Sequence, residues 1–354
     1  MKYWLIPTII FILGLLSILT LSSIAPALAP KQLLFFILGF AFFAFLSRIS
    51  FKQLQNISFI GYIFLLLILI LTLLIGTATK GSLRWIDVGG IFAIQGSQLA
   101  IPIVSLYLVT FLNKKPLTQL KNIVFFLMIT ALPGILILIA PDLGTTVVYI
   151  LSISIILFLS KTKLQHILPL LGLGVITILI AWMFVLQPYQ KTRITSFISP
   201  SDTQGASYNA QQSLIAVGSG QFTGKGLGQG IQSHLRFLPE RQTDFVFASF
   251  AEEFGFIGSI LVVALYTVLI ITTLKTAELA TDTAQKLFCY TTATMTTIQT
   301  GVNIGMNIGL LPITGITLPF FSYGGSSILT LLALFGIVQS IRINTKSKVT
   351  LHLS

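Results

Sequence analysis

Charged residues and cysteine are scarce in this chain. Only 8% of its 354 residues are charged, whereas a soluble domain needs roughly 25% to cover its surface, so the composition excludes an ordinary soluble domain. The single cysteine, Cys289, excludes an internal disulfide and is interpreted as structural. The three histidines, His166, His234 and His352, are scattered, and no cluster of residues has the spacing of a metal site. A requirement for a divalent cation is therefore left open.

Apolar residues, by contrast, make up 55% of the chain, and the mean hydropathy is +0.95. Runs of about 20 apolar residues recur, which is the length of a helix that crosses a bilayer. A membrane also admits closed β-barrels, but these runs lack the polar–apolar alternation of barrel strands. The sequence predicts an all-α polytopic membrane protein with about ten transmembrane helices. The predicted spans are 3–24, 33–47, 56–76, 91–112, 121–140, 144–160, 164–186, 243–274, 287–310 and 323–342.

The positions of lysine and arginine predict the orientation. Thirteen of them fall in segments that share one side with both termini, and three fall in the short loops of the other side. Because cytoplasmic loops are the basic ones, both termini are predicted to be cytoplasmic. Residues 187–242, between helices 7 and 8, then form one long extracytoplasmic loop within a single membrane domain covering 1–354. The net charge of +12 suits contact with anionic membrane lipid, and no motif indicates binding to nucleic acid.

The long loop contains a predicted helix and a glycine-rich segment. Residues 208–218 favour a short amphipathic helix on the membrane surface. Six glycines follow between Gly218 and Gly230, but they do not form a phosphate-binding loop, because Lys225 is followed by Gly226 rather than by serine or threonine. We interpret these glycines mainly as positions that allow tight packing or turns, with direct contact to a ligand as the alternative.

The helix that follows the loop carries a carboxylate and a stripe of small residues. At 100° per residue, Ala248, Ala251, Gly255 and Gly258 lie within about 40° of Asp244. Close packing between helices explains such a stripe. A groove for a lipid-like chain, with Asp244 at its mouth, explains it equally well.

Two further carboxylates, Glu252 and Glu253, fall in the same predicted helix, two turns deeper than Asp244. They lie about 100° apart around the helix axis, so we expect that they do not face one partner. A charge at the middle of a bilayer costs about 2.5–3.5 kcal/mol. The two glutamates therefore either hold helices together through hydrogen bonds or have a function.

Six stretches, spread in order over essentially the whole chain, resemble the SEDS family (shape, elongation, division and sporulation), and specifically its RodA branch. They are KGSLRWIDVGG at 80–90, PDLGTT at 141–146, YQKTRITSFISPSD at 189–202, YNAQQSLIAVGSGQFTGKGLGQG at 208–230, FLPERQTDFVFASFAEEFGFIG at 237–258 and NIGLLPITGITLPFFSYGGSS at 307–327. One stretch departs from the family, which has a glutamate and a lysine in the fourth span. This chain has Gln98 and Ile101 at those positions.

The resemblance implies a peptidoglycan glycosyltransferase in the bacterial cytoplasmic membrane. Such proteins polymerise lipid II, an undecaprenyl-pyrophosphate-linked disaccharide-pentapeptide, during cell elongation and shape maintenance, together with a class B penicillin-binding protein. The family's essential aspartate corresponds to Asp244, and a carboxylate can serve as the base that the reaction needs. The alternative reading is a flippase that moves the lipid-linked precursor, but a transporter is typically built from repeated halves, and this sequence shows no internal repeat.

The reaction also needs cations that offset the charge of the pyrophosphate leaving group. The expected pyrophosphate-binding residues are Arg84, Arg193 and Arg241, followed by Lys80 and Lys225. Trp85 is expected either to stack on a sugar or to anchor the chain at the membrane interface. Glu240 and Glu252 are secondary candidates for the substrate site. Asp142, directly before a predicted helix, is expected to cap that helix rather than to act in catalysis.

Overall fold

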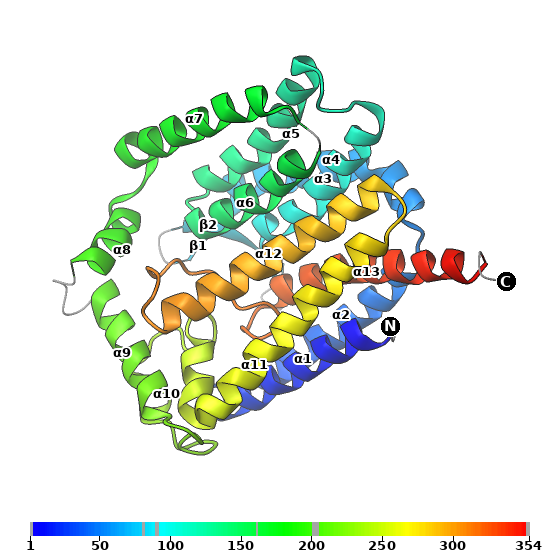
Figure 1. Ribbon diagram of the computed structural model, residues 1–354. Helices are drawn as coiled ribbons and strands as arrows, with labels where there is room; N and C mark the ends of the chain where they lie inside the picture. The colour runs from blue at the N-terminus through cyan, green and yellow to red at the C-terminus, as the bar shows by residue number, and fades with distance from the viewer. Residues whose placement is uncertain (1–2, 80–81, 89–91, 161, 200–204, 352–354) are drawn as a thin grey trace. The chain divides into compact units, whose positions relative to one another are not determined.

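The computed structural model describes residues 3–79, 82–88, 92–160, 162–199 and 205–351, which form mostly helices and one small sheet (Figure 1). The chain divides into two compact units. The first comprises Met1–Ala41, Tyr189–Thr272 and Thr296–Leu331. The second comprises Phe42–Pro188, Thr273–Met295 and Leu332–Ser354.

The helices before residue 188 include seven long ones, two short 3-10 turns and one π-helical turn. They are α1 (Leu5–Ile24), η1 (Pro26–Leu28), α2 (Ala29–Arg48), α3 (Phe51–Ile75), η2 (Gly96–Leu99), α4 (Ala100–Lys114), α5 (Leu120–Ile139), α6 (Leu143–Leu159), α7 (Leu164–Ile180) and η3 (Ala181–Val185). The helices after it are α8 (Pro188–Ile198), α9 (Ala206–Ser219), α10 (Ile231–His234), α11 (Val246–Leu279), α12 (Thr283–Asn307) and α13 (Gly325–Leu351).

Eight helices of the described chain are long and apolar enough to cross a membrane, which confirms the prediction of a multi-pass membrane protein. Two other helices, α6 and α12, explain why the sequence predicted about ten transmembrane helices. α6 is apolar but has only 17 residues, and α12 has 25 residues but is rich in threonine and asparagine. Many of these polar side chains of α12 are buried in the protein, where they can find partners away from lipid. The number of crossings and the side of the long loop stay predictions.

The sheet was not predicted from the sequence. Its strands are β1 (Thr77–Thr79), β2 (Ser82–Val88) and β3 (Phe92–Ile94), in the antiparallel order β1-β2-β3. Trp85 lies opposite Thr77, and Ile86 lies opposite Ile94. The predicted span 91–112 therefore starts too early, because β3 and η2 precede α4. A short apolar run does not distinguish a strand from the start of a helix.

The described part of the long segment 187–242 forms the helices α8, α9 and α10, which follow one another before α11 (Figure 1). α9 covers the predicted amphipathic helix at 208–218, which confirms the helix. Its position on the membrane surface stays a prediction.

α11 is broken at Gly255, whose φ of 67° and ψ of −162° are not helical. A Cβ atom on Gly258 would lie 3.2 Å from Cε1 of Phe250, although residues eight apart in a straight helix are separated by about 12 Å. The two parts of α11 therefore fold sharply against each other. The predicted single stripe running from Asp244 to Gly258 is wrong beyond Ala251, because it assumed one straight helix.

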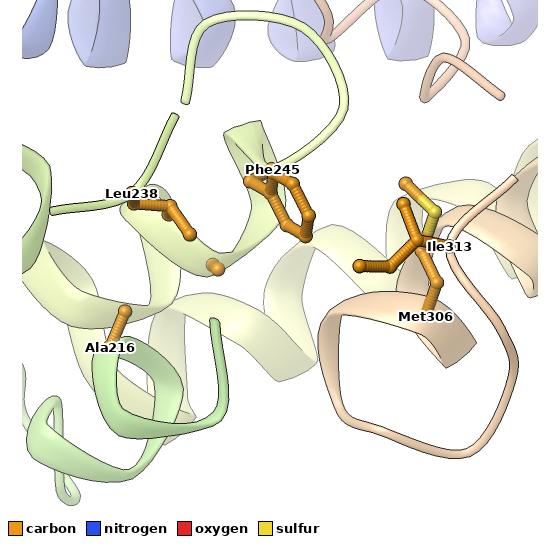
Figure 2. Close-up of a cluster of buried hydrophobic side chains, with 6 residues drawn as sticks. Ala216, Leu238, Phe245, Met306 and Ile313 are labelled. Carbon is orange, nitrogen blue, oxygen red and sulfur yellow. The ribbon is translucent and has the colours of Figure 1, made fainter. Parts of the chain in front are cut away.

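The first unit has a core cluster that surrounds the start of α11 (Figure 2). Phe245 and Ala248 from this region pack with residues from α9, from the segment before α11, and from the end of α12 and the loop after it. These residues are Ala216, Leu238, Met306 and Ile313. Ala248 is fully buried there, so close packing accounts for this small residue.

Candidate active site

The break in α11 exposes four main-chain groups that a continuous helix would pair internally. Residues 221–226 of the glycine-rich segment supply all four partners. The bonds are Lys225 N–H to Glu252 O (3.0 Å), Gly226 N–H to Glu253 O (3.0 Å), Phe256 N–H to Gln221 O (2.9 Å) and Ile257 N–H to Phe222 O (3.2 Å). The segment thus serves as a backbone partner for the broken helix.

The glycines of this segment allow that close approach. Gly224 has a φ of 85°, and a Cβ there would lie 2.1 Å from the main-chain oxygen of Glu253. A Cβ on Gly220 would lie 2.0 Å from the oxygen of Ala251. These contacts favour the interpretation that the glycines allow packing and turns.

Glu252 is fully buried and accepts three hydrogen bonds from α10, which follows the glycine-rich segment. The donors are the main-chain N–H of Gln232 at 2.9 Å, and the N–H and hydroxyl of Ser233 at 3.1 and 2.7 Å. The ammonium of Lys225 lies 4.0 Å from its Oε1. Glu252 thus interacts with Lys225 of the glycine-rich segment and with α10, which favours the structural alternative for Glu252.

Glu253 is also buried, and its partners come from α1, the glycine-rich segment and α10. It accepts hydrogen bonds from the Ser23 hydroxyl and from Gly228 N–H at 3.1 Å, and its Oε1 lies 3.2 Å from Nε2 of His234. The partners of Glu253 differ from those of Glu252, as expected, although residues 225–234 reach both carboxylates.

Asp244 lies in the turn that precedes α11, two residues before the first helical residue. Its main-chain oxygen accepts hydrogen bonds from the side-chain amides of Asn303 (3.1 Å) and Asn307 (3.0 Å), both from α12. The preceding residue is held as well, since the Ser322 hydroxyl donates to the oxygen of Thr243 at 2.6 Å. The turn is therefore fixed on both sides of the candidate base.

The carboxylate of Asp244 and the guanidinium of Arg193 both lie beside Gly315. The Cβ position of Gly315 is 3.6 Å from Oδ2 of Asp244 and 3.4 Å from Nη1 of Arg193. Arg193 belongs to α8 and also lies over the ring of Tyr189, 5.8 Å from its centroid. Of the expected site residues, Arg193 is thus placed beside the proposed base, whereas Lys225 and Glu252 pair with each other. A nearby cation favours the ionised form of a carboxylate, which is the form that a base requires.

Arg241 and Glu240 lie just before Asp244 in the chain. Arg241 donates two hydrogen bonds, of 3.1 and 3.0 Å, to the main-chain oxygen of Ile24 at the end of α1. Burial, and then repulsion from Arg236, lower the pKa of the Arg241 guanidinium from its ordinary value, although a guanidinium remains charged at neutral pH. Glu240 has a φ of 53° and accepts a hydrogen bond of 3.1 Å from the Thr243 hydroxyl. Both residues thus help to shape the turn that carries Asp244.

Arg84 and Trp85 lie on β2 in the second unit, and Lys80 lies outside the described residues. Arg84 donates to the main-chain oxygen of Pro141 and lies 3.7 Å from Oδ1 of Asp142. Asp142 caps α6 as predicted, since its side chain accepts from Thr145 N–H. Arg84 therefore connects the sheet to the start of α6. Trp85 is half-buried, and both of its expected roles, stacking on a sugar or anchoring the chain at the membrane interface, stay open.

Residues 95–101, which depart from the family pattern, lie next to Asp142, the cap of α6. Gln95 and Ser97 donate to Oδ2 of Asp142, at 3.0 and 2.9 Å, and the Gln98 amide lies 3.4 Å from Oε1 of Gln95. Uncharged side chains that donate to the Asp142 carboxylate thus hold this region together. Among the described residues, no group of three or more histidine, cysteine or acidic side chains is arranged to hold a metal ion.

Three residues of the site, Asn303, Asn307 and Gly315, were not singled out from the sequence. The two asparagines carry a signal that could have found them, because amide side chains inside a predicted apolar span usually have a specific partner. Gly315 carries no such signal. Its φ of 74° and its neighbours become evident only once the chain is folded.

A family model and the related proteins point to the same family. A family model described as cell cycle protein, for FtsW, RodA and SpoVE, matches residues 1–347. The chain is 39% identical over 291 residues to peptidoglycan glycosyltransferase MrdB of Escherichia coli, covering 80% of this chain and 77% of that protein. It is 37% identical over 328 residues to the probable peptidoglycan glycosyltransferase FtsW of Coxiella burnetii, covering 90% and 87% of the two chains.

Solved structures agree over nearly the whole length. The rod shape determining protein RodA of Thermus thermophilus matches with a TM-score of 0.72 and 26% identity, covering 96% of each chain. A chain from a structure that describes the coordination of polymerization and crosslinking by a peptidoglycan synthase complex matches with a TM-score of 0.83 and 27% identity. That match covers 97% of this chain and 98% of the other.

Proposed function

The chain belongs to the FtsW, RodA and SpoVE family of cell cycle proteins, and we propose that it is a peptidoglycan glycosyltransferase of the RodA branch. It is a multi-pass protein of the bacterial cytoplasmic membrane, and its reaction builds glycan strands during cell elongation and shape maintenance. Its substrate is lipid II, polymerised at the outer face of the membrane.

Asp244 is the proposed base, and its position beside Arg193 at Gly315 is the observation that carries the proposal. In the reaction, a hydroxyl oxygen of the acceptor sugar forms a bond to the anomeric carbon of the donor sugar. The bond from that carbon to the pyrophosphate oxygen breaks, and the lipid pyrophosphate leaves with the negative charge. Asp244 takes the proton of the acceptor hydroxyl, and a cation close to the reacting groups offsets the charge of the leaving group.

Arg193 is the first candidate for that cation because it lies beside the proposed base. Arg241 holds the end of α1, Lys225 lies near Glu252, and Arg84 lies beside Asp142. These three residues are proposed to act mainly by supporting the architecture. Contact of Lys80 or Trp85 with substrate stays a proposal from the family resemblance.

The rival function is transport of the lipid-linked precursor. A broken helix inside a membrane protein is a feature of transporters, whose unwound main chain binds the transported substrate or ion. The four groups released at the break in α11 are already paired with residues 221–226, so they do not need a substrate. This favours the glycosyltransferase.

A functional experiment distinguishes the two classes. The purified full-length chain should convert lipid II into glycan strands in detergent, where no membrane separates two compartments. We propose that the chain works with a class B penicillin-binding protein, which crosslinks the new strands. The proposal is overturned in favour of the flippase if the chain makes no strands, alone or with this partner, but moves labelled lipid II across a liposome membrane.

A further inference from the structure

Asn303 and Asn307 lie one turn apart on α12, and both side chains are fully buried. Residues four apart share one face of a helix, so the two amides point toward the same neighbours. Burying a polar amide without a hydrogen-bond partner is unfavourable. The partners of these two amides therefore indicate what the pair holds in place.

Both amides converge on the main-chain oxygen of Asp244. Each Nδ2 also makes a second hydrogen bond: Asn303 donates to the oxygen of Ile316 at 2.7 Å, and Asn307 donates to the oxygen of Asn303 at 2.8 Å. Ile316 directly follows Gly315 in the chain. The single amide of Asn303 thus connects the residue that carries the proposed base to the loop that carries Gly315.

Asn307 also completes the start of α11. The first N–H groups of a helix have no partner inside the helix, and a polar side chain at the cap usually supplies one. The residue before α11 is Phe245, which has no polar side chain. Asn307 of α12 supplies the missing capping group, since its Oδ1 accepts the N–H of Ala248 at 3.0 Å. Ser213 of α9 in turn donates to the main-chain oxygen of Asn307 at 2.9 Å.

We propose that Asn303 and Asn307 are positioning residues for glycosyl transfer. They fix the main chain at Asp244 relative to residues 315–316, and thereby hold its carboxylate beside Gly315 and Arg193. The inference rests on the proposed function of Asp244 as the base. A misplacement of about 1 Å in such a group can reduce the rate on the order of 100-fold, and the apolar cluster in Figure 2 contains no donor that could replace the amides.

The test compares Asn303→Leu with Tyr62→Phe in the full-length chain. Leucine resembles asparagine in shape but has no donor. Tyr62 is a matched control, because its buried hydroxyl also donates to a main-chain oxygen, that of Ile129 at 3.0 Å, and lies in the second unit. Both variants should melt at lower temperature. Only Asn303→Leu should lower kcat for lipid II polymerisation, by about 10- to 100-fold, with KM nearly unchanged.

Two further variants keep the test decisive. Asn303→Ser retains one donor, so its kcat should be intermediate, and it replaces the leucine variant if that protein does not fold. In the Asp244→Asn background, Asn303→Leu should cause little additional loss, because no base remains to be positioned.

The outcomes separate this inference from the proposed function. If Asn303→Leu lowers kcat no more than Tyr62→Phe does, or lowers it by the same factor in the Asp244→Asn background, the positioning role is wrong while the base remains Asp244. If Asp244→Asn itself polymerises at nearly the normal rate, the proposed base is wrong, and the inference is lost with it.

Discussion

At the scale of single residues, Gly315 is the position that lies beside both the proposed base and the neighbouring cation. Its Cβ position is within 4 Å of both the Asp244 carboxylate and the Arg193 guanidinium, and its φ of 74° disfavours any other residue. The added Cβ would make only ordinary van der Waals contacts there, so Gly315→Ala should act through the backbone. Relief of the disfavoured φ shifts this loop relative to Asp244, and we expect polymerisation of lipid II to fall about 10-fold or more. Strand formation by the purified, folded variant measures this.

Gly218 provides the control for that substitution. It lies in α9, and a Cβ there has no neighbour within 4 Å. Gly218→Ala should therefore leave polymerisation unchanged and stabilise the helix by about 0.5–1 kcal/mol. A Gly315→Ala variant as active as Gly218→Ala would contradict the assignment of the substrate to this place.

At the scale of elements, the packing of residues 220–226 against the break in α11 should contribute strongly to stability. Gly224→Ala forces an alanine into the left-handed region at a cost of about 1–2 kcal/mol, and its Cβ would also clash with the oxygen of Glu253. We expect a clearly lower melting temperature than for Gly218→Ala. Thermal unfolding of the two variants in the same detergent is the measurement, and equal melting temperatures would show that the segment is not firmly docked.

The sequence predicted much of the element structure, for physical reasons that can be named. Long apolar runs identified helices such as α1 and α5, and the pattern at 208–218 identified α9. The break at Gly255 was not predicted, because a glycine inside a helical pattern does not reveal a left-handed residue whose freed main-chain groups have partners 27 or 35 residues away. The sheet escaped as well, since β3 is short and leads directly into an apolar helix. Asp244 was singled out because it lies at the mouth of the predicted small-residue stripe and matches the family's essential aspartate, whereas Asn303 was missed because its partner is a main-chain oxygen.

At the scale of the whole molecule, the orientation in the membrane is predicted from the basic residues. Single cysteines at Ser199, in the long loop, and at Thr118, between α4 and α5, should behave differently in intact cells. Both positions are exposed, while the native Cys289 is fully buried and gives little background. A membrane-impermeant thiol reagent should label Ser199→Cys and not Thr118→Cys. The reverse pattern would invert the orientation and place Asp244 on the wrong side for lipid II.

The partner is also a property of the whole molecule. We expect the full-length chain, extracted at its native expression level, to co-purify with a class B penicillin-binding protein, because strands must be crosslinked as they are made. Affinity purification followed by mass spectrometry tests this. Recovery of the chain alone from several mild detergents would contradict a stable complex.

The central claim is that Asp244 is the base of a lipid II polymerase, and one comparison tests it most directly. The purified full-length chain, its Asp244→Asn variant and its Glu252→Gln variant are supplied with lipid II, after each has been shown to be folded. Asparagine keeps the size of the side chain and removes its basicity, so the strand-forming rate should fall about 10²–10⁴-fold. Glu252→Gln should affect stability more than rate, because Glu252 is buried among donors of residues 232–233. Strand formation by Asp244→Asn at nearly the unmodified rate would contradict the claim, and Glu240 would then be the carboxylate to examine.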